Sequence, residues 1–280
     1  MRRCSQFSIA IPQTLAHHVG ETFRQKTGQG ATLSVTTPLL VLLAVANIII
    51  CCYTDVDNKT CRQARGTMPI IAVTGRKGGG GKTSLAGHLV GEFLAMGKTV
   101  MALDADPQKS LSKWARMGEG LLNRLVDVVE AKKDDKTFQQ VVNTTASAVD
   151  LVLVDCPPGF ADVSLWTLEV ADIALLPVAS NVLDLFAAGE MLELVELIRQ
   201  ERKGKPFPTV VANKVRANTS AAKEISAALE RLDAEVMPAI GLREIVSSCC
   251  LQGLTLAEAA PSSTARRELT ALAKRLEKML

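Results

Sequence analysis

The sequence predicts an α/β protein whose mostly parallel sheet is covered by helices on both faces. Short apolar runs rich in β-branched residues alternate with segments of helical composition from Met68 onward. The first run leads into a glycine-rich loop, and two later runs end in acidic residues. Because parallel strands need a crossover between them, this alternation favours a sheet with helices on either side.

The expected strands are the short apolar runs. Nearly continuous apolar character is typical of strands that are buried on both faces of a parallel sheet. In chain order they span residues 69–74, 98–103, 151–154, 173–178 and 209–212.

The segments between these runs are expected to be helices. The first covers residues 85–96 and stops at Gly97, a residue suited to a left-handed helix end. Thr219 is a suitable N-cap, and Thr255 begins a capping-box spacing with an acid three residues later. The expected helices are 85–96, most of 119–149, 184–200, 220 to about 232, a short one after Thr255, and 265–280.

The loop between the first strand and the first helix reads G-R-K-G-G-G-G-K-T-S over residues 75–84. Glycines allow several backbone N–H groups to point at one anion, and the helix that follows adds its positive N-terminal end. Lys82 is placed to reach the β and γ phosphates, and the Thr83 hydroxyl is placed to bind Mg²⁺. We therefore expect a P-loop NTPase fold, with a nucleotide held by Gly78, Gly79, Gly80, Gly81, Lys82, Thr83 and Ser84.

A second lysine, Lys77, lies inside the loop. With Gly78, Gly79, Lys82 and Thr83 it matches the pattern K-G-G-x-x-K-[ST], so the chain resembles the ParA/MinD family of deviant Walker-A ATPases. The resemblance covers about residues 68–280 and is closest to the small, single-domain plasmid partition ATPases. It is most specific at residues 75–84, 104–114 and 155–159.

Acidic residues follow two of the expected strands. Asp104 and Asp106 end the second strand, and Asp155 ends the third. Carboxylates at the C-terminal ends of parallel strands lie where ligands bind, and here they suit Mg²⁺ and a water nucleophile. In related nucleotide folds an Asn at the position of Asn213 contacts the base, although a simple turn is the alternative.

The resemblance implies a switch driven by ATP and Mg²⁺. ATP binding would join two subunits, and Lys77 of each would reach the phosphates held by the other. Asp106 would position the attacking water, Thr83 would bind Mg²⁺ directly, and Asp104 and Asp155 would hold it through waters. The dimer would bind DNA without sequence preference, and a ParB-like partner would stimulate hydrolysis. A cytoplasmic, nucleoid-associated protein is expected.

The net charge of +3 does not itself indicate a nucleic-acid partner. Residues 1–67 carry 7 Lys and Arg against 3 Asp and Glu, whereas residues 68–280 carry 25 against 26. The basic surplus therefore lies outside the nucleotide-binding part. Any DNA affinity of that part must come from local patches.

The last expected helix offers such a patch. At helical spacing, leucines 269, 272, 276 and 280 share one face, and Arg267, Lys274 and Lys278 share the opposite face. These three cations are candidate DNA contacts, with Arg243 as a reserve. A merely solvated basic face is the alternative.

Residues 1–67 differ in composition from the rest. No charged residue occurs between Gly28 and Thr54, and residues 39–53 are nearly continuously apolar. A membrane span usually needs about 20 such residues, so the segment is short for one. We interpret residues 1–67 as an over-extended start or a poorly ordered leader, and residues 68–280 as the ATPase domain.

Two other classes of protein share the loop. A metabolic or electron-transfer relative, such as an iron–sulfur ATPase or an amidase-type ligase, would need cysteine ligands or an additional substrate domain. None of the seven cysteines has a C-x-x-C spacing, and no such domain is evident in the sequence. A MinD-like membrane-associated positioning ATPase would carry a C-terminal basic amphipathic helix. The last helix has leucines but no large aromatic residue, so membrane binding is ranked below DNA binding.

Overall fold

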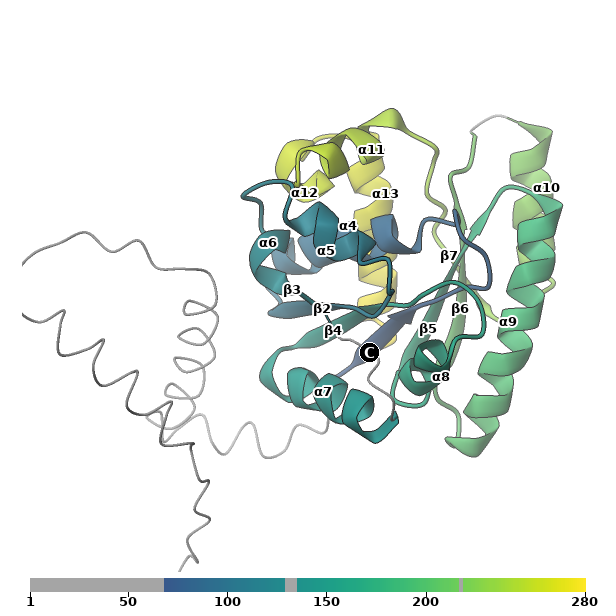
Figure 1. The fold of residues 1–280 in the computed structure, drawn as a ribbon. Coiled ribbons are helices and arrows are strands. Elements are labelled where there is room, and N and C mark those ends of the chain that lie inside the picture. The colour runs from purple at the N-terminus through teal and green to yellow at the C-terminus, as the bar shows by residue number, and fades with distance from the viewer. Residues whose placement is uncertain (1–67, 129–134, 217–218) are drawn as a thin grey trace, which may run out of the picture. The chain divides into compact units, whose positions relative to one another are not determined.

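The structure is a computed structural model that describes residues 68–128, 135–216 and 219–280 (Figure 1). The expected N-terminal extension, residues 1–67, and its apolar segment, residues 39–53, lie outside the described residues. None of the helices in the described part is both long and apolar enough to span a membrane.

A parallel sheet forms the centre of the fold, which confirms the predicted architecture. Seven strands are described, in the order β3-β2-β4-β1-β5-β6-β7, and every neighbouring pair is parallel. They are β1 (Ile70–Val73), β2 (Val100–Asp104), β3 (Val126–Val128), β4 (Leu151–Asp155), β5 (Ile173–Ala179), β6 (Phe207–Asn213) and β7 (Glu235–Met237).

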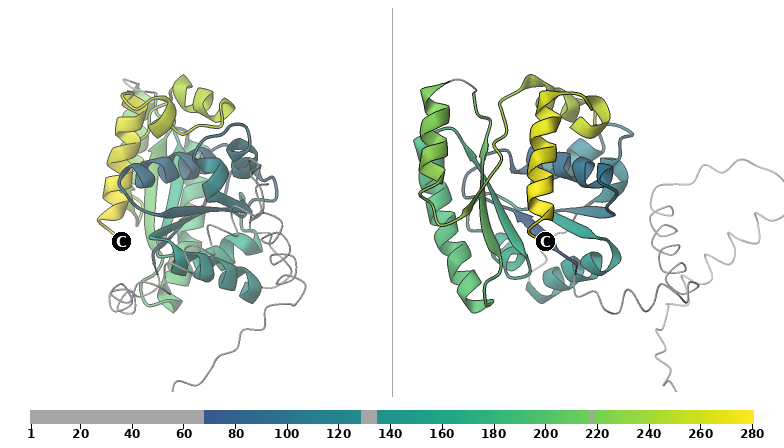
Figure 2. Two further views of the ribbon diagram at one scale, coloured as in Figure 1. Left: turned by 90° about the vertical axis from the view of Figure 1, so that its left-hand side faces the viewer. Right: turned by 180° about the vertical axis from the view of Figure 1, so that it is seen from behind.

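Helices cover both faces of this sheet (Figures 1 and 2). Those against one face are α4 (Lys82–Ala95), α5 (Ser110–Ala115), α6 (Leu122–Leu125), α11 (Glu244–Leu251), α12 (Leu256–Ala259) and α13 (Thr264–Glu277). Those against the other are α7 (Asp135–Ala148), α8 (Asp162–Leu168), α9 (Val182–Glu201) and α10 (Ser220–Leu229).

The central strand β1 divides the interior into two cores. Successive side chains of a strand point to opposite faces. Accordingly Ile71 and Val73 pack with α4 and α13, whereas Ile70 and Ala72 pack with α7 and α9. Because both faces are buried, every residue of β1 is apolar, as the continuous apolar run predicted.

The sequence pattern misses the two edge strands. Residues 119–149 were expected to be largely helical, but this is wrong for Val126–Val128, which form β3 at one edge of the sheet. Glu235–Met237 form β7 at the other edge. Both strands are three residues long, which is too short for a periodic signal, and pairing with a longer neighbour decides their conformation.

Helix ends and faces follow the sequence more closely. The Thr219 side chain caps α10 by accepting from the Ala222 N–H, and Thr255 forms the expected capping box with Glu258. On α13 the leucines at 269, 272 and 276 share one face, as predicted, and they are buried in the core that also contains residues of α4 and of the sheet. The prediction is wrong for Leu280, which lies past the end of the helix and is 45% exposed.

Candidate nucleotide-binding site

The glycine-rich loop joins β1 to the start of α4, at the C-terminal end of the strands. Gly79 and Gly81 adopt left-handed backbone angles, with φ of 82° and 94°. A Cβ on Gly81 would lie 2.3 Å from Nδ2 of Asn213, so this position tolerates no side chain. Gly81 is also the N-cap of α4 and has no capping side chain. The first N–H groups of the helix therefore remain available to an anion.

Lys82 is buried at the first position of α4. Its Nζ donates to the carbonyl of Lys77, 2.9 Å away across the loop. Burial lowers the pKa of Lys82, and the nearby Asp155 carboxylate opposes that shift. The ammonium group is thus held over the loop beside a negative charge, which is the placement that a phosphate-binding lysine requires.

Asp155 is the most unusual carboxylate of the site. It is fully buried at the end of β4, next to Asp104 at the end of β2, and neither of its oxygens has a hydrogen-bond partner. Burial raises the pKa of Asp155 to about 7, and the Thr83 hydroxyl partly opposes the rise. A buried carboxylate without partners is costly, so a cation or an ordered water nearby would satisfy it.

Asp104 has a different environment. Its Oδ2 accepts from the backbone N–H of Ser112 at 2.8 Å and from the Ser112 hydroxyl at 2.7 Å. Its Oδ1 accepts from the N–H of Asp106 at 3.3 Å. Through these three hydrogen bonds, Asp104 connects the turn after β2 to the start of α5.

A cleft of about 420 Å³ opens beside the loop and collects most of the expected site residues. Asp106 faces it from the turn after β2, where its Oδ1 accepts from the Gln108 N–H at 2.8 Å. The lining residues that the sequence predicted are Gly78, Gly79, Gly81, Lys82, Thr83, Ser84 and Asp106.

Lys77 contacts a different part of the molecule. Its ammonium lies 3.5 Å from Oδ1 of Asp184, in the first turn of α9. The neighbouring Arg76 pairs with Glu190 of the same helix and stacks over the ring of Phe160, 5.4 Å away. Arg76 stands where the spacing G-x-x-x-x-G-K-[ST] has its first glycine. Both of these cations are thus paired with acidic side chains of α9.

Five lining residues were not among the predicted site residues: Ser110, Trp114, Pro158, Lys214 and Cys250. Only Lys214 had a usable signal, since it directly follows Asn213 at the end of a strand. Lys214 donates to the Gly79 carbonyl and Asn213 donates to the Gly80 carbonyl, both at 2.8 Å. The amide nitrogen of Asn213 thus donates to the loop backbone, and the expected contact of Asn213 with a base stays a prediction.

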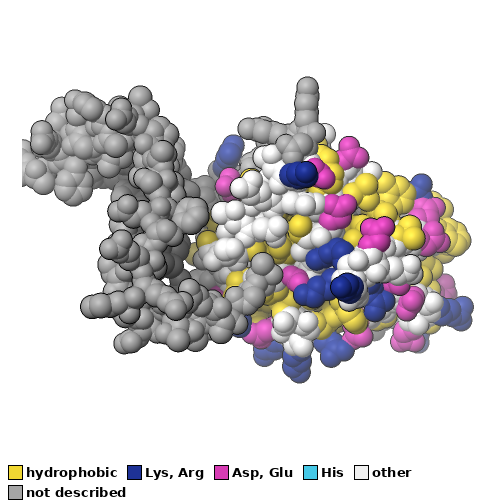
Figure 3. Space-filling view, turned by 90° about the horizontal axis from the view of Figure 1, so that it is seen from below, with side chains coloured by type: hydrophobic (Ala, Val, Ile, Leu, Met, Phe, Trp, Pro, Cys, Tyr) yellow, Lys and Arg dark blue, Asp and Glu magenta, His cyan; other side chains and the backbone are white. Residues whose placement is uncertain are grey.

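The candidate DNA contacts lie on the exposed side of α13. Arg267, Lys274 and Lys278 are all exposed, and Arg267 donates to the Thr264 hydroxyl at 2.7 Å. Arg243 differs, because it is half-buried and paired with Glu268 of α13. Over the face seen from below, Lys and Arg are interspersed with Asp and Glu (Figure 3). Because it is paired with Glu268, Arg243 is a weaker candidate for a DNA contact than the three exposed cations.

Of the three described cysteines, Cys156 and Cys249 are buried and Cys250 is half-buried. Burial raises the pKa of Cys156 to about 12 and that of Cys250 to about 11. Within the described ranges, no three His, Cys, Asp or Glu side chains gather as a set of metal ligands.

These features define a nucleotide-binding protein of the P-loop class. Residues 71–256 match the family described as the CobQ/CobB/MinD/ParA nucleotide binding domain, and the chain belongs to this family. The deviant Walker-A resemblance of its loop is thereby confirmed.

The chain is similar to one relative over most of that relative's length and to another over about half of it. The chain is 27% identical to maintenance of carboxysome distribution protein A of Halothiobacillus neapolitanus over 188 residues, 66% of this chain and 85% of the relative. It is 34% identical to protein ParA of Rhizobium radiobacter over 130 residues, 46% of this chain and 56% of the relative. The fold matches the ATP complex of a Cyanothece McdA variant with a TM-score of 0.62 and 18% identity, covering 77% and 97% of the two chains.

Proposed function

We propose that this chain is a Mg²⁺-dependent ATPase that dimerises on ATP binding, binds DNA without sequence preference, and partitions or positions DNA or another cargo with a ParB-like partner. The observation that carries the proposal is the arrangement around the loop. Lys82, Thr83 and Asp106 share one cleft, whereas Lys77 of the same loop does not line that cleft and pairs with Asp184 of α9. That division suits a site completed by two subunits.

The loop and the start of α4 would bind the triphosphate. The uncapped first turn of α4 offers N–H donors and the positive end of the helix dipole. Lys82 would leave the carbonyl of Lys77 for the β and γ phosphates. The low-dielectric surroundings of this ammonium strengthen its attraction to phosphate oxygens.

The residues present also fit a Mg²⁺ ion. Both oxygens of Asp155 are buried without partners and lie beside Thr83, which is the arrangement a hydrated cation would satisfy. Thr83 would bind the ion directly and Asp155 would hold its waters, with Asp104 assisting through the turn that it anchors. When bound, Mg²⁺ supplies charge neutralisation on the phosphate oxygens.

Asp106 is the residue that we assign to the water nucleophile. It is half-buried at the cleft, and one of its oxygens is held by the Gln108 N–H. A carboxylate held in this way can accept a proton or orient a water without holding the nucleotide. The charge that develops on the transferred phosphoryl group would then be met by Lys77 of the second subunit.

The proposed partners rest on the relatives. One is named for carboxysome distribution and another is a ParA protein, which supports a positioning or partition role. We assign DNA contact to Arg267, Lys274 and Lys278, because Arg267 and Lys274 are exposed on α13 and Lys278 is exposed directly after it. We also propose that the protein acts on the nucleoid in the cytoplasm. Residues 68–280 would form its ATPase domain, and residues 1–67 would be an extension.

The role of Lys77 tests the centre of this proposal. We expect Lys77→Ala to bind ATP with parental affinity but to lose ATP-dependent dimerisation and most hydrolysis. Light scattering gives the dimer fraction, and phosphate release gives the rate. Asp184→Asn removes the carboxylate that pairs with Lys77 and that also accepts from the Asn181 amide. It is the matched control and should dimerise. Parental turnover in Lys77→Ala would refute the two-subunit mechanism.

The DNA assignment has a separate test. Changing Arg267, Lys274 and Lys278 together to Ala should weaken binding to random duplex DNA and flatten its salt dependence, because fewer counterions are released. Fluorescence anisotropy with ATP at two salt concentrations measures both. The control is Lys223→Ala, an exposed lysine of α10. Equal affinity and equal salt slope would show that the α13 face is only solvated.

A further inference from the structure

The end of β6 holds the phosphate loop at two adjacent carbonyl groups. Nδ2 of Asn213 donates to the carbonyl of Gly80, and Nζ of Lys214 donates to the carbonyl of Gly79, each over 2.8 Å. The two side chains come from consecutive residues that lie more than 130 positions from the loop in sequence. We call this pair of contacts the loop clasp.

The backbone at Lys214 is shaped to make the clasp. Its φ of 56° is left-handed, a conformation that residues with side chains seldom adopt. The turn is held by the Asn213 side chain, whose Oδ1 accepts from the Lys214 N–H at 3.0 Å. Val215 then pairs with Ile240, its N–H donating to that carbonyl at 3.0 Å. A strained backbone conformation that neighbouring hydrogen bonds maintain is a feature of functional positions.

The clasp decides where the loop N–H groups point. In a trans peptide unit the C=O and the following N–H point in opposite directions. Because the carbonyls of Gly79 and Gly80 are drawn toward β6, the N–H groups of Gly80 and Gly81 are turned away from it. Such oriented N–H groups form an anion-binding concavity.

Lys214 also presents charge to the nucleotide cleft, whose wall it shares with Lys82 and Thr83. An ammonium group has three N–H donors, and the Gly79 carbonyl uses one of them. The side chain is exposed, so its remaining donors can turn toward a ligand. Its position parallels that of Lys82, which likewise donates to a carbonyl of the loop.

We propose that Asn213 and Lys214 are further residues of the phosphate site, Asn213 as a positioning residue for the loop and Lys214 as a direct ligand of a nucleotide phosphate. This inference rests on the proposed function, since it takes the ligand to be ATP or ADP. It differs from the base contact expected for Asn213, because the clasp acts on the phosphate end of the ligand.

Calorimetric titration with Mg-ATP and Mg-ADP tests the role of Lys214. We expect Lys214→Ala to weaken both affinities by about tenfold or more, as for a lost charge-assisted hydrogen bond, and Lys214→Arg to recover most of the loss. The melting temperature without nucleotide should not change, which separates ligand binding from folding. Lys223→Ala, an exposed lysine of α10, should behave as the parent.

Hydrogen exchange of the full chain tests the role of Asn213. We expect Asn213→Asp, which removes the donor to Gly80, to speed exchange at the amides of residues 79–81 and to weaken both nucleotides, with exchange in α13 unchanged. A purely structural role would instead speed exchange across the core.

Three outcomes decide the inference. Parental nucleotide affinity in Lys214→Ala, or unchanged loop exchange in Asn213→Asp, would overturn it while the proposed function stands. A parent protein that binds neither nucleotide would overturn both. Reduced affinity that Lys214→Arg restores would support it.

Discussion

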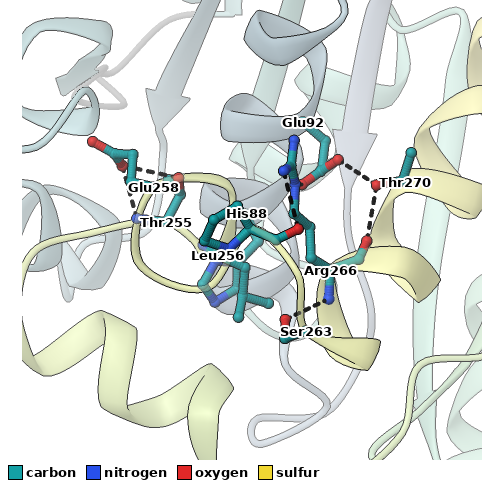
Figure 4. Close-up of polar contacts among 9 residues, drawn as sticks. His88, Glu92, Thr255, Leu256, Glu258, Ser263, Arg266 and Thr270 are labelled. Carbon is teal, nitrogen blue, oxygen red and sulfur yellow. Dashed lines mark hydrogen bonds and ion pairs between the residues drawn. The ribbon is translucent and has the colours of Figure 1, made fainter.

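The two ends of helix α4 carry polar residues in opposite situations. At its N-terminal end, Lys82 and Thr83 face an open cleft, and the adjacent Asp155 has no hydrogen-bond partner. From the middle of the helix onward, His88 and Glu92 are buried, and their partners include residues of the last two helices (Figure 4). One helix therefore contains both a site left open to a ligand and a closed polar cluster.

The closed cluster joins α4 to the C-terminal helices. Nδ1 of His88 accepts from the Leu256 N–H at 3.1 Å, at the start of α12. Glu92 accepts from Nε of Arg266 at 3.0 Å and from the Thr270 hydroxyl at 2.6 Å, both on α13 (Figure 4). Satisfied in this way, buried polar groups specify how α12 and α13 dock.

This difference indicates that residues for folding stability and residues for nucleotide binding occupy separate parts of α4. A buried group with all its partners inside the protein can contribute only to the fold. A group whose partners are missing costs stability until a ligand supplies them. Substitutions at the open end should therefore change nucleotide binding, and substitutions at the closed cluster should change the free energy of unfolding.

The largest effect is expected at the open end. Lys82→Ala should abolish measurable ATP binding, a loss of at least about a hundredfold, because a desolvated ammonium is removed from the phosphates. Its melting temperature without nucleotide should be close to the parental value. Calorimetric titration measures the affinity, with Lys98→Ala, whose exposed side chain pairs with Glu277, as control. Retained affinity would place the phosphates elsewhere.

The second effect is expected in the closed cluster. Arg266→Ala should lower the free energy of unfolding by about 3 kcal/mol, because it leaves the carboxylate of Glu92, only 1% exposed, without its cation. Urea denaturation measures the loss. The neighbouring Arg267→Ala is the matched control and should cost well under about 1 kcal/mol, since that side chain is exposed. Nucleotide affinity should stay parental in both variants, and a joint loss would contradict the separation.

The third and smallest effect depends on pH. Burial lowers the pKa of His88 from 6.5 to about 4. The unfolded chain therefore binds the proton first, and stability is lost as pH falls from about 6.5 toward 4. The full loss from this residue is roughly 3 kcal/mol, with only part of it reached at pH 5. Urea midpoints between pH 7 and 5 should decline less in His88→Gln than in the parent. An equal decline would assign the acid sensitivity to other groups.

The comparison also shows which features could be predicted from the sequence. The open end was predictable almost residue by residue, because glycines, Lys82 and Thr83 act through adjacent backbone. Capping by Thr219 and Thr255 was predictable for the same local reason. The closed cluster was not predicted, since neither His88 nor Glu92 stands in a motif.

For Asp104 and Asp155, the sequence predicted their position but not their environment. That Asp104 and Asp155 would lie together followed from their places at the ends of parallel strands, and their register confirms it. Their different environments did not follow. Asp104 is hydrogen-bonded to Ser112, whereas Asp155 has no partner, because the turn into α5 reaches only one of them.

By itself the sequence determined the alternating α/β architecture, the phosphate loop and the helix caps, because each depends on residues within one turn or one strand. The tertiary structure alone decided the short edge strands, the pairing of Lys77 with α9, the loop clasp and the docking of α13. These depend on partners far apart in sequence: Asn213 lies 133 positions from Gly80, and Arg266 lies 174 positions from Glu92. Local sequence propensity cannot predict such contacts, because only the packing of helices on the sheet brings these distant residues within hydrogen-bond distance.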